Sequence, residues 1–477
     1  MTSPANTHSP LEVDYLVIGA GAMGMAFVDT LLSETDATVA IFDRYSQPGG
    51  HWTVAYPFVR LHQPSAFYGV SSKTLGTGAI DATGPNAGLH ELATSDEVLD
   101  YFDRVMRDTF LASGRVHYFP MSSFDDLATA VSGSESPGTQ RFRSQVTGAI
   151  TEVVVRRRVV DATYQNVTVP AMVPPRYEIA DGVEVVTPNA LTTLSSPWAR
   201  FTVVGAGKTG IDVCLWLLER GVDPDAISWI TPRDAWLLDR ARIQPRKPDA
   251  PQTGDGGMWM AGALQTESID EILLGFEAIG MVMRIDPEVT PRAYRCATVT
   301  RTELESLRRI RNIVRHGKVR RIEPDSIVFD EITLPAHPDT LYIDCTADGL
   351  ERRPTVPIFD GHRITLQPVI PCQQVFSAAL AAHVEAAYPD DATRNTLCAP
   401  SPHPDSAQDL LGYGIEIAER TALWSGDADL LAWLHTSRSV ITFPDAVDPE
   451  RQARMTALVG QLREKFAGIL AWDAAIV

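Results

Sequence analysis

Hydrophobic residues form short continuous runs along the chain, each followed by a stretch with helical spacing. The runs at 15–18 and 201–204 consist of aliphatic, β-branched and aromatic residues, as expected for strands buried on both faces of a parallel sheet. Behind them, apolar residues recur at helical spacing over 23–32 and 211–218, and Gly221 stands where a helix C-cap is expected. The pattern therefore predicts a strand, a turn and a helix at two places in the chain.

A glycine-rich turn of the form GxGxxG joins each strand to its helix. The glycines are Gly19, Gly21 and Gly24 in the first turn and Gly205, Gly207 and Gly210 in the second, 186 positions further along. In such a turn the first glycine permits the tight bend, the second lets the backbone approach a pyrophosphate, and the third lets the helix pack on the strand. Lys208 and Thr209 belong to the second turn, where Lys208 contacts either a phosphate or only solvent. A ligand-free turn is the alternative for each copy, but the pair predicts two dinucleotide sites.

Composition and charge narrow the class of protein. The chain has 477 residues, 44% hydrophobic and 21% charged, which is ordinary for a globular protein of two or three domains. Its net charge of -19 disfavours binding to nucleic acids and anionic membranes. No apolar run is long enough to span a bilayer, and residues 1–10 are polar, lack the basic start of a signal peptide and are predicted to be disordered. We therefore expect a cytoplasmic enzyme with a small-molecule substrate, either a monomer or a homodimer.

The cysteines and histidines give no sign of metal or thiol chemistry. Five cysteines are scattered, without a CxxC pair, at Cys214, Cys296, Cys345, Cys372 and Cys398. This spacing argues against structural disulfides, zinc ribbons and the dithiol chemistry of thioredoxin reductases. HExxH, GxSxG and phosphate-binding GxxxxGKS/T motifs are also absent, so no metal site is expected.

The second strand of the first unit ends in an acidic residue. The hydrophobic run 38–42 is followed by Asp43 and Arg44, about as far after the glycines as the ribose-binding acid of a dinucleotide domain should lie. A carboxylate there accepts hydrogen bonds from both ribose hydroxyls and repels a 2′-phosphate. The first site is therefore predicted to bind FAD or NAD.

The second strand of the second unit ends differently. The run 227–230 leads into Thr231 and Arg233, a hydroxyl and a guanidinium that suit the 2′-phosphate of NADPH. The second site is therefore predicted to bind NADPH. The alternative is that Arg233 pairs with Asp234 or Asp239 on the surface.

The segment after Asp43 resembles a known group of enzymes. It contains Gly49-Gly50-His51-Trp52 and then a stretch that begins with tyrosine, 56–65. It is similar to the corresponding segment of flavin-dependent monooxygenases with two dinucleotide-binding domains: the flavin-containing monooxygenases, the N-hydroxylases and the Baeyer-Villiger enzymes. The resemblance implies FAD in the first site, with Gly50 and Trp52 near the cofactor. Trp52 then either takes part in the chemistry or only covers the flavin ring.

Positions 56–65 match this group to different degrees. Tyr56, Pro57 and Arg60 coincide with the Baeyer-Villiger form. His62 stands where those enzymes have an aspartate and the flavin-containing monooxygenases an asparagine. The resemblance implies that Arg60, His62 and Gln63 surround the flavin, and that His62 donates to a flavin-bound peroxide or orients NADP. The alternative is that His62 is a hydrogen-bonded loop histidine without a chemical role.

Weaker matches extend the resemblance over most of the chain. Residues 159–163 and 342–349 are similar to the strand-plus-ATG segments that return to the FAD domain in these folds. The resemblance implies that Asp348 approaches the flavin diphosphate or ribityl chain, and that residues 364–368 lie near the ring. The FxGxxxH fingerprint of the Baeyer-Villiger and flavin-containing enzymes is absent before the second glycine turn, which indicates an outlying branch of the superfamily.

These anchors predict an α/β fold with two Rossmann-like dinucleotide-binding domains, for FAD and NADPH, a helical insertion and a helical C-terminal region. The FAD domain is expected to comprise residues 11–194 and 341–477, and the NADPH domain residues 195–340. The insertion, at about 243–315, includes a long loop rich in proline and glycine. It forms either a lid or substrate wall, or a passive decoration.

Capping motifs and apolar spacing predict further helices. A capping box formed by Thr94 and Glu97 starts one of them. Helices are also expected over 268–282 and, capped by Thr302-x-x-Glu305, over 303–314. Tryptophans in the helices beyond residue 377 face either the core or a substrate.

Together these features predict an FAD-containing, NADPH-dependent monooxygenase. NADPH would reduce the flavin, and reduced flavin would trap O₂ as a C4a-(hydro)peroxide that transfers oxygen to a nitrogen, sulfur or carbonyl carbon of a small molecule. A reductase or dehydrogenase with the same cofactors but without oxygen insertion is one alternative. A non-catalytic cofactor-binding protein is the other.

Overall fold

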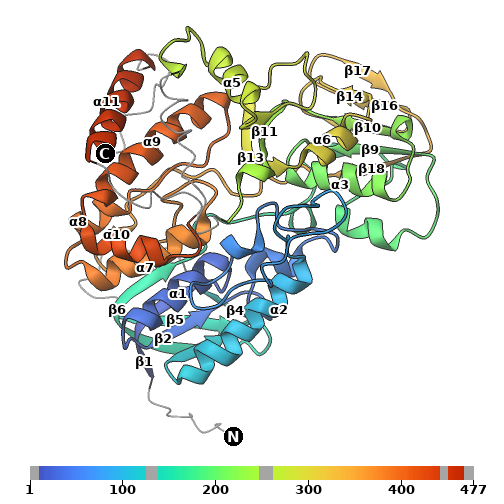
Figure 1. The fold of residues 1–477 in the computed structure, drawn as a ribbon. Coiled ribbons are helices and arrows are strands. Elements are labelled where there is room, and N and C mark those ends of the chain that lie inside the picture. The colour runs from blue at the N-terminus through green and yellow to red at the C-terminus, as the bar shows by residue number, and fades with distance from the viewer. Residues whose placement is uncertain (1–9, 125–137, 246–261, 441–448, 467–477) are drawn as a thin grey trace, which may run out of the picture.

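The computed structural model describes residues 10–124, 138–245, 262–440 and 449–466, and contains two α/β units and a group of C-terminal helices (Figure 1). The N-terminal segment predicted to be disordered and most of the proline-rich loop after Arg242 lie outside these ranges. Within them, no helix has the length and apolar character needed to cross a membrane.

The first unit is built on a mostly parallel sheet with the strand order β19-β20-β6-β1-β2-β3. The strands are β1 (Leu11–Ile18), β2 (Val39–Phe42), β3 (Val116–Phe119), β6 (Ile150–Asp161), β19 (Phe359–Asp360) and β20 (Arg363–Thr365). A hairpin of β4 (Ser122–Phe124) and β5 (Thr139–Ser144) pairs with β6. Because β20 pairs in parallel with β6, the chain returns to this sheet after it has formed the second unit.

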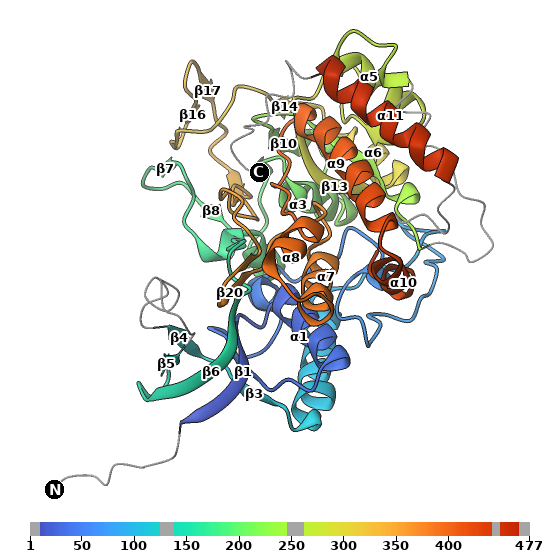
Figure 2. The ribbon, with the colours of Figure 1, turned by 90° about the vertical axis from the view of Figure 1, so that its left-hand side faces the viewer.

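Helices α1 (Ala22–Glu34) and α7 (Gln374–Ala387) lie side by side on the first sheet (Figures 1 and 2). Both helices are apolar over most of their surface, and Phe27 and Phe376 are fully buried between the layers. Helix α2 (Ser95–Val105) packs into the same core. It begins at the predicted capping box, in which the Thr94 hydroxyl accepts from the amide of Glu97 and the Glu97 carboxylate accepts from the amide of Thr94.

The second unit has a five-stranded, fully parallel sheet with the order β14-β10-β9-β18-β8. Its strands are β8 (Val185–Val186), β9 (Arg200–Val204), β10 (Ile227–Ile230), β14 (Asn312–Val314) and β18 (Thr340–Asp344), with helices α3 (Lys208–Glu219) and α6 (Arg301–Leu307) packed together beside it. The predicted boundaries at 194 and 341 assign β8 and most of β18 to the first unit, whereas their hydrogen bonds place both strands in the second sheet.

A smaller layer connects the second unit with the C-terminal helices. It contains a sheet of β11 (Ala235–Asp239), β12 (Val282–Met283) and β13 (Ala293–Val299), and helix α5 (Ile269–Ala278). The C-terminal helices are α8 (Asp391–Leu397), α9 (Ala407–Ser425), α10 (Ala428–Thr436) and α11 (Pro449–Phe466), of which α9 contacts α5, α11 and β13. A separate sheet is formed by β7 (Glu178–Ile179), β15 (Arg321–Ile322), β16 (Ser326–Val328) and β17 (Thr333–Pro335).

The helices predicted in the insertion differ from those observed. The helix expected over 268–282 ends at Ala278, and residue 282 begins strand β12. The capping residue of α6 is Thr300, paired with Glu303 and not Thr302 with Glu305, and the hydroxyl of Thr300 also donates to the carbonyl of Pro85. The last residues of the expected helix form β14 because they pair with β10.

One of the tryptophans in the helices beyond residue 377 belongs to the core. Trp424 is 1% exposed and donates its indole N–H to the carbonyl of Leu397. For this residue the structure therefore supports the core alternative over contact with a substrate.

Candidate functional site

The two glycine turns have the same local geometry, at the carboxyl ends of β1 and β9. The φ angle is 103° at Gly19 and 120° at Gly205, values that residues with a Cβ atom rarely adopt. A Cβ on Gly24 or Gly210 would collide with the carbonyl oxygen of the first glycine of the same turn. The first and third glycines therefore meet the structural requirements of the motif in both turns.

The second glycine of each turn is open to a ligand. A Cβ built on Gly207 would have no protein atom within 4 Å, and one built on Gly21 would meet only the Cα of Gly50, at 3.6 Å. Packing of the protein therefore does not require glycine at either position. A pyrophosphate that lies against the backbone of these residues does require glycine, because a side chain would occupy the same space.

Helices α1 and α3 start without side-chain caps. Gly21 and Gly207 are their N-cap residues, and neither makes a side-chain capping hydrogen bond. A side chain caps each of α2, α5, α6, α8, α9 and α10, whereas α7 also begins without a side-chain cap. Free amides and the positive end of the helix dipole attract anions, so both turns suit a phosphate group.

Asp43 lies at the end of β2, beside the first turn. Its carboxylate accepts a hydrogen bond from the amide of Ala20 at 2.5 Å and another from the amide of Tyr45 at 2.7 Å. Burial raises the pKa of Asp43, and these bonds and the charge of Arg44 oppose the rise. Because a carboxylate has about four acceptor positions, Asp43 retains capacity for the hydroxyls of a ribose. The guanidinium of Arg44 lies over the ring of Tyr45, 4.9 Å from its centre.

The GGHW segment packs on the first turn. The amide of Gly49 donates to the carbonyl of Ala20 at 2.9 Å. Trp52 is buried, and its indole N–H donates to the hydroxyl of Tyr68 at 2.8 Å. Burial lowers the pKa of His51 to about 4, so this imidazole is neutral near pH 7.

Tyr56 connects the segment after the first turn with the second turn. Its hydroxyl donates to the carboxylate of Asp212 at 2.7 Å, and Asp212 also pairs with Lys208, one helical turn earlier on α3. Burial, followed by the charge of Asp212, raises the pKa of Tyr56 well above its ordinary value, so the hydroxyl keeps its proton. Lys208 is therefore anchored by an acidic partner within the site.

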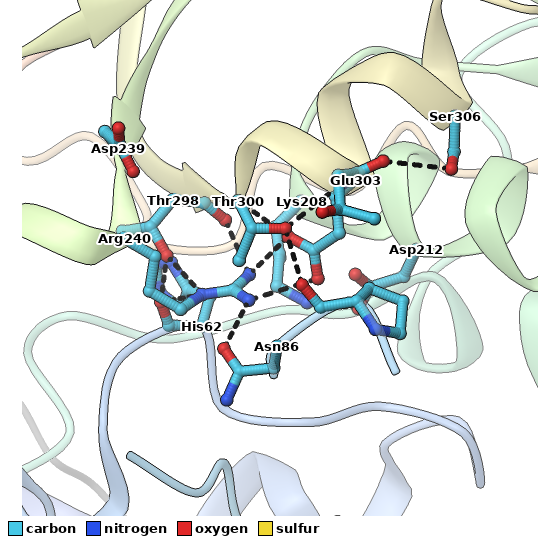
Figure 3. A network of polar contacts seen from close by, with 12 residues as sticks. His62, Asn86, Lys208, Asp212, Asp239, Arg240, Thr298, Thr300, Glu303 and Ser306 are labelled. Atoms are coloured by element: carbon cyan, nitrogen blue, oxygen red, sulfur yellow. Dashed lines mark hydrogen bonds and ion pairs between the residues drawn. The ribbon is translucent and has the colours of Figure 1, made fainter. Parts of the chain in front are cut away.

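His62 lies at the contact between the two units (Figure 3). Its backbone carbonyl accepts hydrogen bonds from the guanidinium of Arg240 at 3.3 Å and from the hydroxyl of Thr298. Its ring Nδ1 is buried and has no hydrogen-bond partner among the described residues. Burial, with smaller effects from the charges of Lys208 and Arg240, lowers the pKa of His62 to about 3. The imidazole is therefore neutral, and one of its nitrogens is buried without a hydrogen-bond partner among the described residues.

A buried polar network at this contact centres on Arg240, which the sequence prediction does not include. Arg240 is 3% exposed, pairs with Glu303 at 2.8 Å and donates to the side-chain oxygen of Asn86 at 3.1 Å (Figure 3). Glu303 belongs to the second unit, whereas Asn86 and His62 belong to the first. Asp239-Arg240 at the end of a hydrophobic run is the only sequence signal of this network, and charged strand ends are too common to identify it.

Arg60 makes its contacts within the first unit. It is exposed, its guanidinium donates to the carbonyl of Leu92 at 3.4 Å, and its backbone pairs with Thr94. Gln63, next to His62 in the chain, is half-buried. The structure therefore groups His62 with Lys208 and Arg240 more closely than with Arg60.

Thr231 and Arg233 follow strand β10, where the sequence places them. Thr231 is 1% exposed, and its hydroxyl has no hydrogen-bond partner in the described part of the chain. Arg233 forms an ion pair at 2.8 Å with Asp405, not with Asp234 or Asp239, the two partners that the sequence suggested. The partner comes from the loop before α9, more than 170 residues away, and local sequence gives no sign of it.

Asp405 is in contact with three arginines. Arg295 pairs with it at 3.1 Å, Arg352 also contacts it, and Arg233 is the third partner. Three guanidinium groups therefore gather near the end of β10, with the carboxylates of Asp409 and Asp348 also close by. Such a cluster suits a phosphate.

Asp348 follows β18, a strand of the second sheet. It pairs with Arg176 at 2.7 Å, and its side chain is 38% exposed. The next residue, Gly349, forms a backbone bridge with Thr168. The resemblance implies a place at the flavin, whereas the structure puts Asp348 after a strand that neighbours the second turn.

Cys296 and Cys372 form a disulfide bond, so the prediction that the chain has no structural disulfide is wrong. Their Cα atoms are 6.4 Å apart, although the residues are 76 positions apart in the sequence. Cys214, Cys345 and Cys398 are buried free thiols. Cysteine spacing identifies local motifs, and it carries no information on two cysteines that the fold brings together from distant strands and loops.

Comparison with known sequences places the chain in a family. No family model matches the sequence. The chain is 51% identical over 436 residues to the uncharacterized protein Rv2000 of Mycobacterium tuberculosis (strain H37Rv) and to the uncharacterized protein Mb2023 of Mycobacterium bovis, covering 91% of this chain and 78% of each relative. The chain belongs to the same family as these mycobacterial proteins. A ferredoxin–NADP reductase of Salinispora tropica is 32% identical over 92 residues, 19% of this chain and 28% of the reductase.

Solved structures similar to the chain carry names from the group of enzymes that the sequence resembles. An open form of cyclohexanone monooxygenase is 14% identical, covers 97% of this chain and 99% of its own, and has a TM-score of 0.49. A steroid monooxygenase bound to NADP is 13% identical, with 97% and 98% covered and a TM-score of 0.48. A complex of OTEMO with FAD and NADP is 15% identical, with 80% and 85% covered and a TM-score of 0.49. The predicted α/β class is confirmed by the two parallel sheets of this chain itself.

Proposed function

We propose that the protein is an FAD-containing, NADPH-dependent monooxygenase that acts on a small molecule. The observation that carries the proposal is the pair of matching glycine turns, each with an uncapped helix and a second glycine at which the protein leaves room for a Cβ atom. The hydrogen bond from Tyr56 to Asp212 joins the segment after the first turn to the helix of the second. Two dinucleotide sites connected in this way suit transfer of a hydride from one cofactor to the other.

FAD would be held by the first turn. The amides at the N-terminus of α1 would bind the pyrophosphate, with Gly21 allowing its close approach. Asp43 would accept hydrogen bonds from the ribose, beside Arg44. Gly50 and Trp52 would line the cofactor, since the amide of Gly49 holds their segment against the same turn.

NADPH would be held by the second turn. The amides at the N-terminus of α3, including Lys208 and Thr209, would bind its pyrophosphate next to Gly207. Thr231 and the arginines around Asp405, Arg233 among them, would bind the 2′-phosphate. The unpartnered buried hydroxyl of Thr231 supports this assignment, because buried polar groups rarely lack a hydrogen bond and a phosphate oxygen would supply one.

His62 would act between the two cofactors. The low pKa of His62 keeps its imidazole neutral at physiological pH, so it would orient a bound group through its free nitrogen without adding charge. When bound, the flavin supplies hydride acceptance and oxygen activation. The protein contributes orientation, and its packed contact between the two units keeps water away.

A stopped-flow experiment tests this proposal. The full chain would be reconstituted with FAD, reduced anaerobically with NADPH and then mixed with O₂. The proposal expects retained flavin, reduction by NADPH, and a transient absorbance of a flavin–oxygen adduct before reoxidation. Reoxidation without an adduct would instead identify the reductase alternative, which the 92-residue likeness to a ferredoxin–NADP reductase favours. Protein that stays colourless with added FAD would contradict both.

A further inference from the structure

Three side chains with thiol and acid–base chemistry meet outside the proposed cofactor sites. The Sγ atoms of Cys296 and Cys372 and a ring nitrogen of His403 all lie within 4.8 Å of one another. Cys296 is in strand β13, Cys372 is two residues before helix α7, and His403 is in the loop between α8 and α9. The cluster therefore joins three parts of the chain.

Backbone hydrogen bonds hold these parts in place. The amide of Ser401 donates to the carbonyl of Pro368 at 2.7 Å, close to Cys372. The amide of Tyr294 donates to the carbonyl of Asp405 at 3.0 Å, close to Cys296. The loop that carries His403 is thus fixed to both cysteine-bearing segments.

Both cysteines have an unusual backbone conformation. The φ angle is 55° at Cys296 and 66° at Cys372, and Met121 and Asn166 are the only other non-glycine residues with positive φ in the described part of the chain. Cys296 also lies in an irregularity of the sheet, where residues 295–297 of β13 stand opposite the single residue between Trp236 and Leu238 of β11. Such conformations persist where the surrounding structure enforces them, and they cluster at functional sites.

The surroundings suit reversible thiol chemistry. Burial, together with the charges of Arg295 and Arg352, lowers the pKa of His403, so its imidazole is neutral and can accept a proton from a thiol. Arg295, the chain neighbour of Cys296, pairs with Asp405, and a positive charge close to a cysteine favours its thiolate. Cys296 is 5% exposed and Cys372 is half-buried, so Cys372 is the more exposed member of the pair.

We propose that Cys296, Cys372 and His403 form a reversible dithiol–disulfide redox site that a dithiol reduces. One thiol of the reductant loses its proton to His403 and attacks the sulfur of Cys372, which breaks the disulfide and releases Cys296 as a thiolate. Cys296 takes the proton from His403. The second thiol of the reductant then attacks the mixed disulfide, releases Cys372 as a thiol and leaves the reductant as a cyclic disulfide. Two electrons and two protons pass to the cysteine pair.

The redox state of this site controls a covalent link between two layers of the molecule. When oxidised, it ties the β12-β11-β13 sheet to the start of α7, which packs on α1, the helix that follows the first glycine turn. When reduced, only non-covalent contacts remain. Oxidants would therefore form, and dithiols would break, the covalent link between the insertion and the predicted flavin unit.

Thiol counting tests the proposal in the full-length protein with FAD added. The protein is equilibrated in mixtures of reduced and oxidised dithiothreitol, quenched with acid, unfolded and alkylated, and its mass gives the number of labelled cysteines. We expect three labels at the oxidising end and five at the reducing end, in one two-electron transition, because Cys214, Cys345 and Cys398 remain free thiols. Five labels under all conditions would overturn the proposal. So would stoichiometric zinc in the isolated protein that protects both cysteines until a chelator removes it.

Variants identify the members of the site. Cys296→Ser and Cys372→Ser should each show four labels at every potential, whereas the control Cys398→Ser should still change by two. His403→Asn should leave the midpoint of the transition in place and slow reduction by dithiothreitol about a hundredfold. An unchanged rate in this variant would remove His403 from the site. These counts do not depend on oxygen chemistry, so they stand apart from the proposed monooxygenase activity.

Discussion

Gly21 and Gly207 differ from the other glycines of their turns because the protein alone has room for a methyl group at both positions. Gly21→Ala and Gly207→Ala are therefore expected to change the free energy of unfolding by less than about 1 kcal/mol. Gly21→Ala should be purified without flavin, and Gly207→Ala should keep its flavin while its KM for NADPH rises at least about tenfold.

Thermal unfolding, flavin absorbance and NADPH kinetics measure these effects. Gly275→Ala in α5 is the matched control, since a Cβ there also meets no atom within 4 Å and the residue lies far from both turns in the sequence. If both turn variants bind FAD and NADPH as tightly as the parent protein, the turns are not the cofactor sites.

We expect Arg233 to set the preference between NADPH and NADH. Arg233→Ala removes one charge-assisted contact to the 2′-phosphate, so kcat/KM for NADPH should fall about 10- to 100-fold while kcat/KM for NADH stays nearly constant. Arg311→Ala, which removes an exposed arginine paired with Asp225, is the control. An equal loss with both coenzymes would mean that Arg233 has only a structural role.

The buried imidazole of His62 makes the free energy of unfolding depend on pH. Its pKa is about 3 in the folded protein, below the value of about 6.5 expected in the unfolded chain. Between these values the unfolded state binds more protons, so the free energy of unfolding decreases as the pH falls from about 6.5 towards about 3. Thermal unfolding of His62→Gln across this range should show a shallower loss than the parent protein. The exposed residue His117 provides the control variant, His117→Gln, and an identical slope in all three proteins would disprove the assignment.

Among the helices and strands, sequence patterns correctly predicted those that short-range interactions determine. The strands before both turns, the two helices after them, β2 and β10 are present where hydrophobic runs and glycines place them. The capping box at Thr94 is also confirmed. These features depend on hydrophobic periodicity, turn conformation and helix capping, all of which are determined within a few residues.

Other elements depend on partners that are distant in the sequence. Thr300 and Thr302 both have a glutamate three residues later, so the pattern alone cannot choose the cap of α6. Thr300, which caps the helix in the structure, also donates a hydrogen bond to the carbonyl of Pro85, a residue more than 200 positions away. The end of that expected helix became β14 because an edge of the second sheet was available beside β10. The disulfide, Arg240 and the pairing of Arg233 with Asp405 were missed or misassigned for the same reason.

At the scale of the whole molecule, the Arg240 network determines how the two units meet. Glu303→Gln keeps a side chain that can still cap α6 but leaves the buried charge of Arg240 without its partner. We expect the free energy of unfolding to fall by about 3–5 kcal/mol. Glu97→Gln is the matched control, because Glu97 occupies the same capping-box position in α2 but is exposed, and it should cost less than about 0.5 kcal/mol. Equal losses in chemical denaturation would show that capping, and not the contact between the units, accounts for the effect.

The central claim is that electrons pass from NADPH at the second turn to FAD at the first. Anaerobic stopped-flow mixing of the FAD-loaded protein with NADPH tests it most directly, with flavin absorbance as the signal. We expect the flavin to be bleached in a single turnover, and Gly207→Ala to retain the flavin but to need at least about ten times more NADPH for the same rate. Flavin that stays oxidised in the parent protein, or that is bleached equally well in Gly207→Ala, would contradict it.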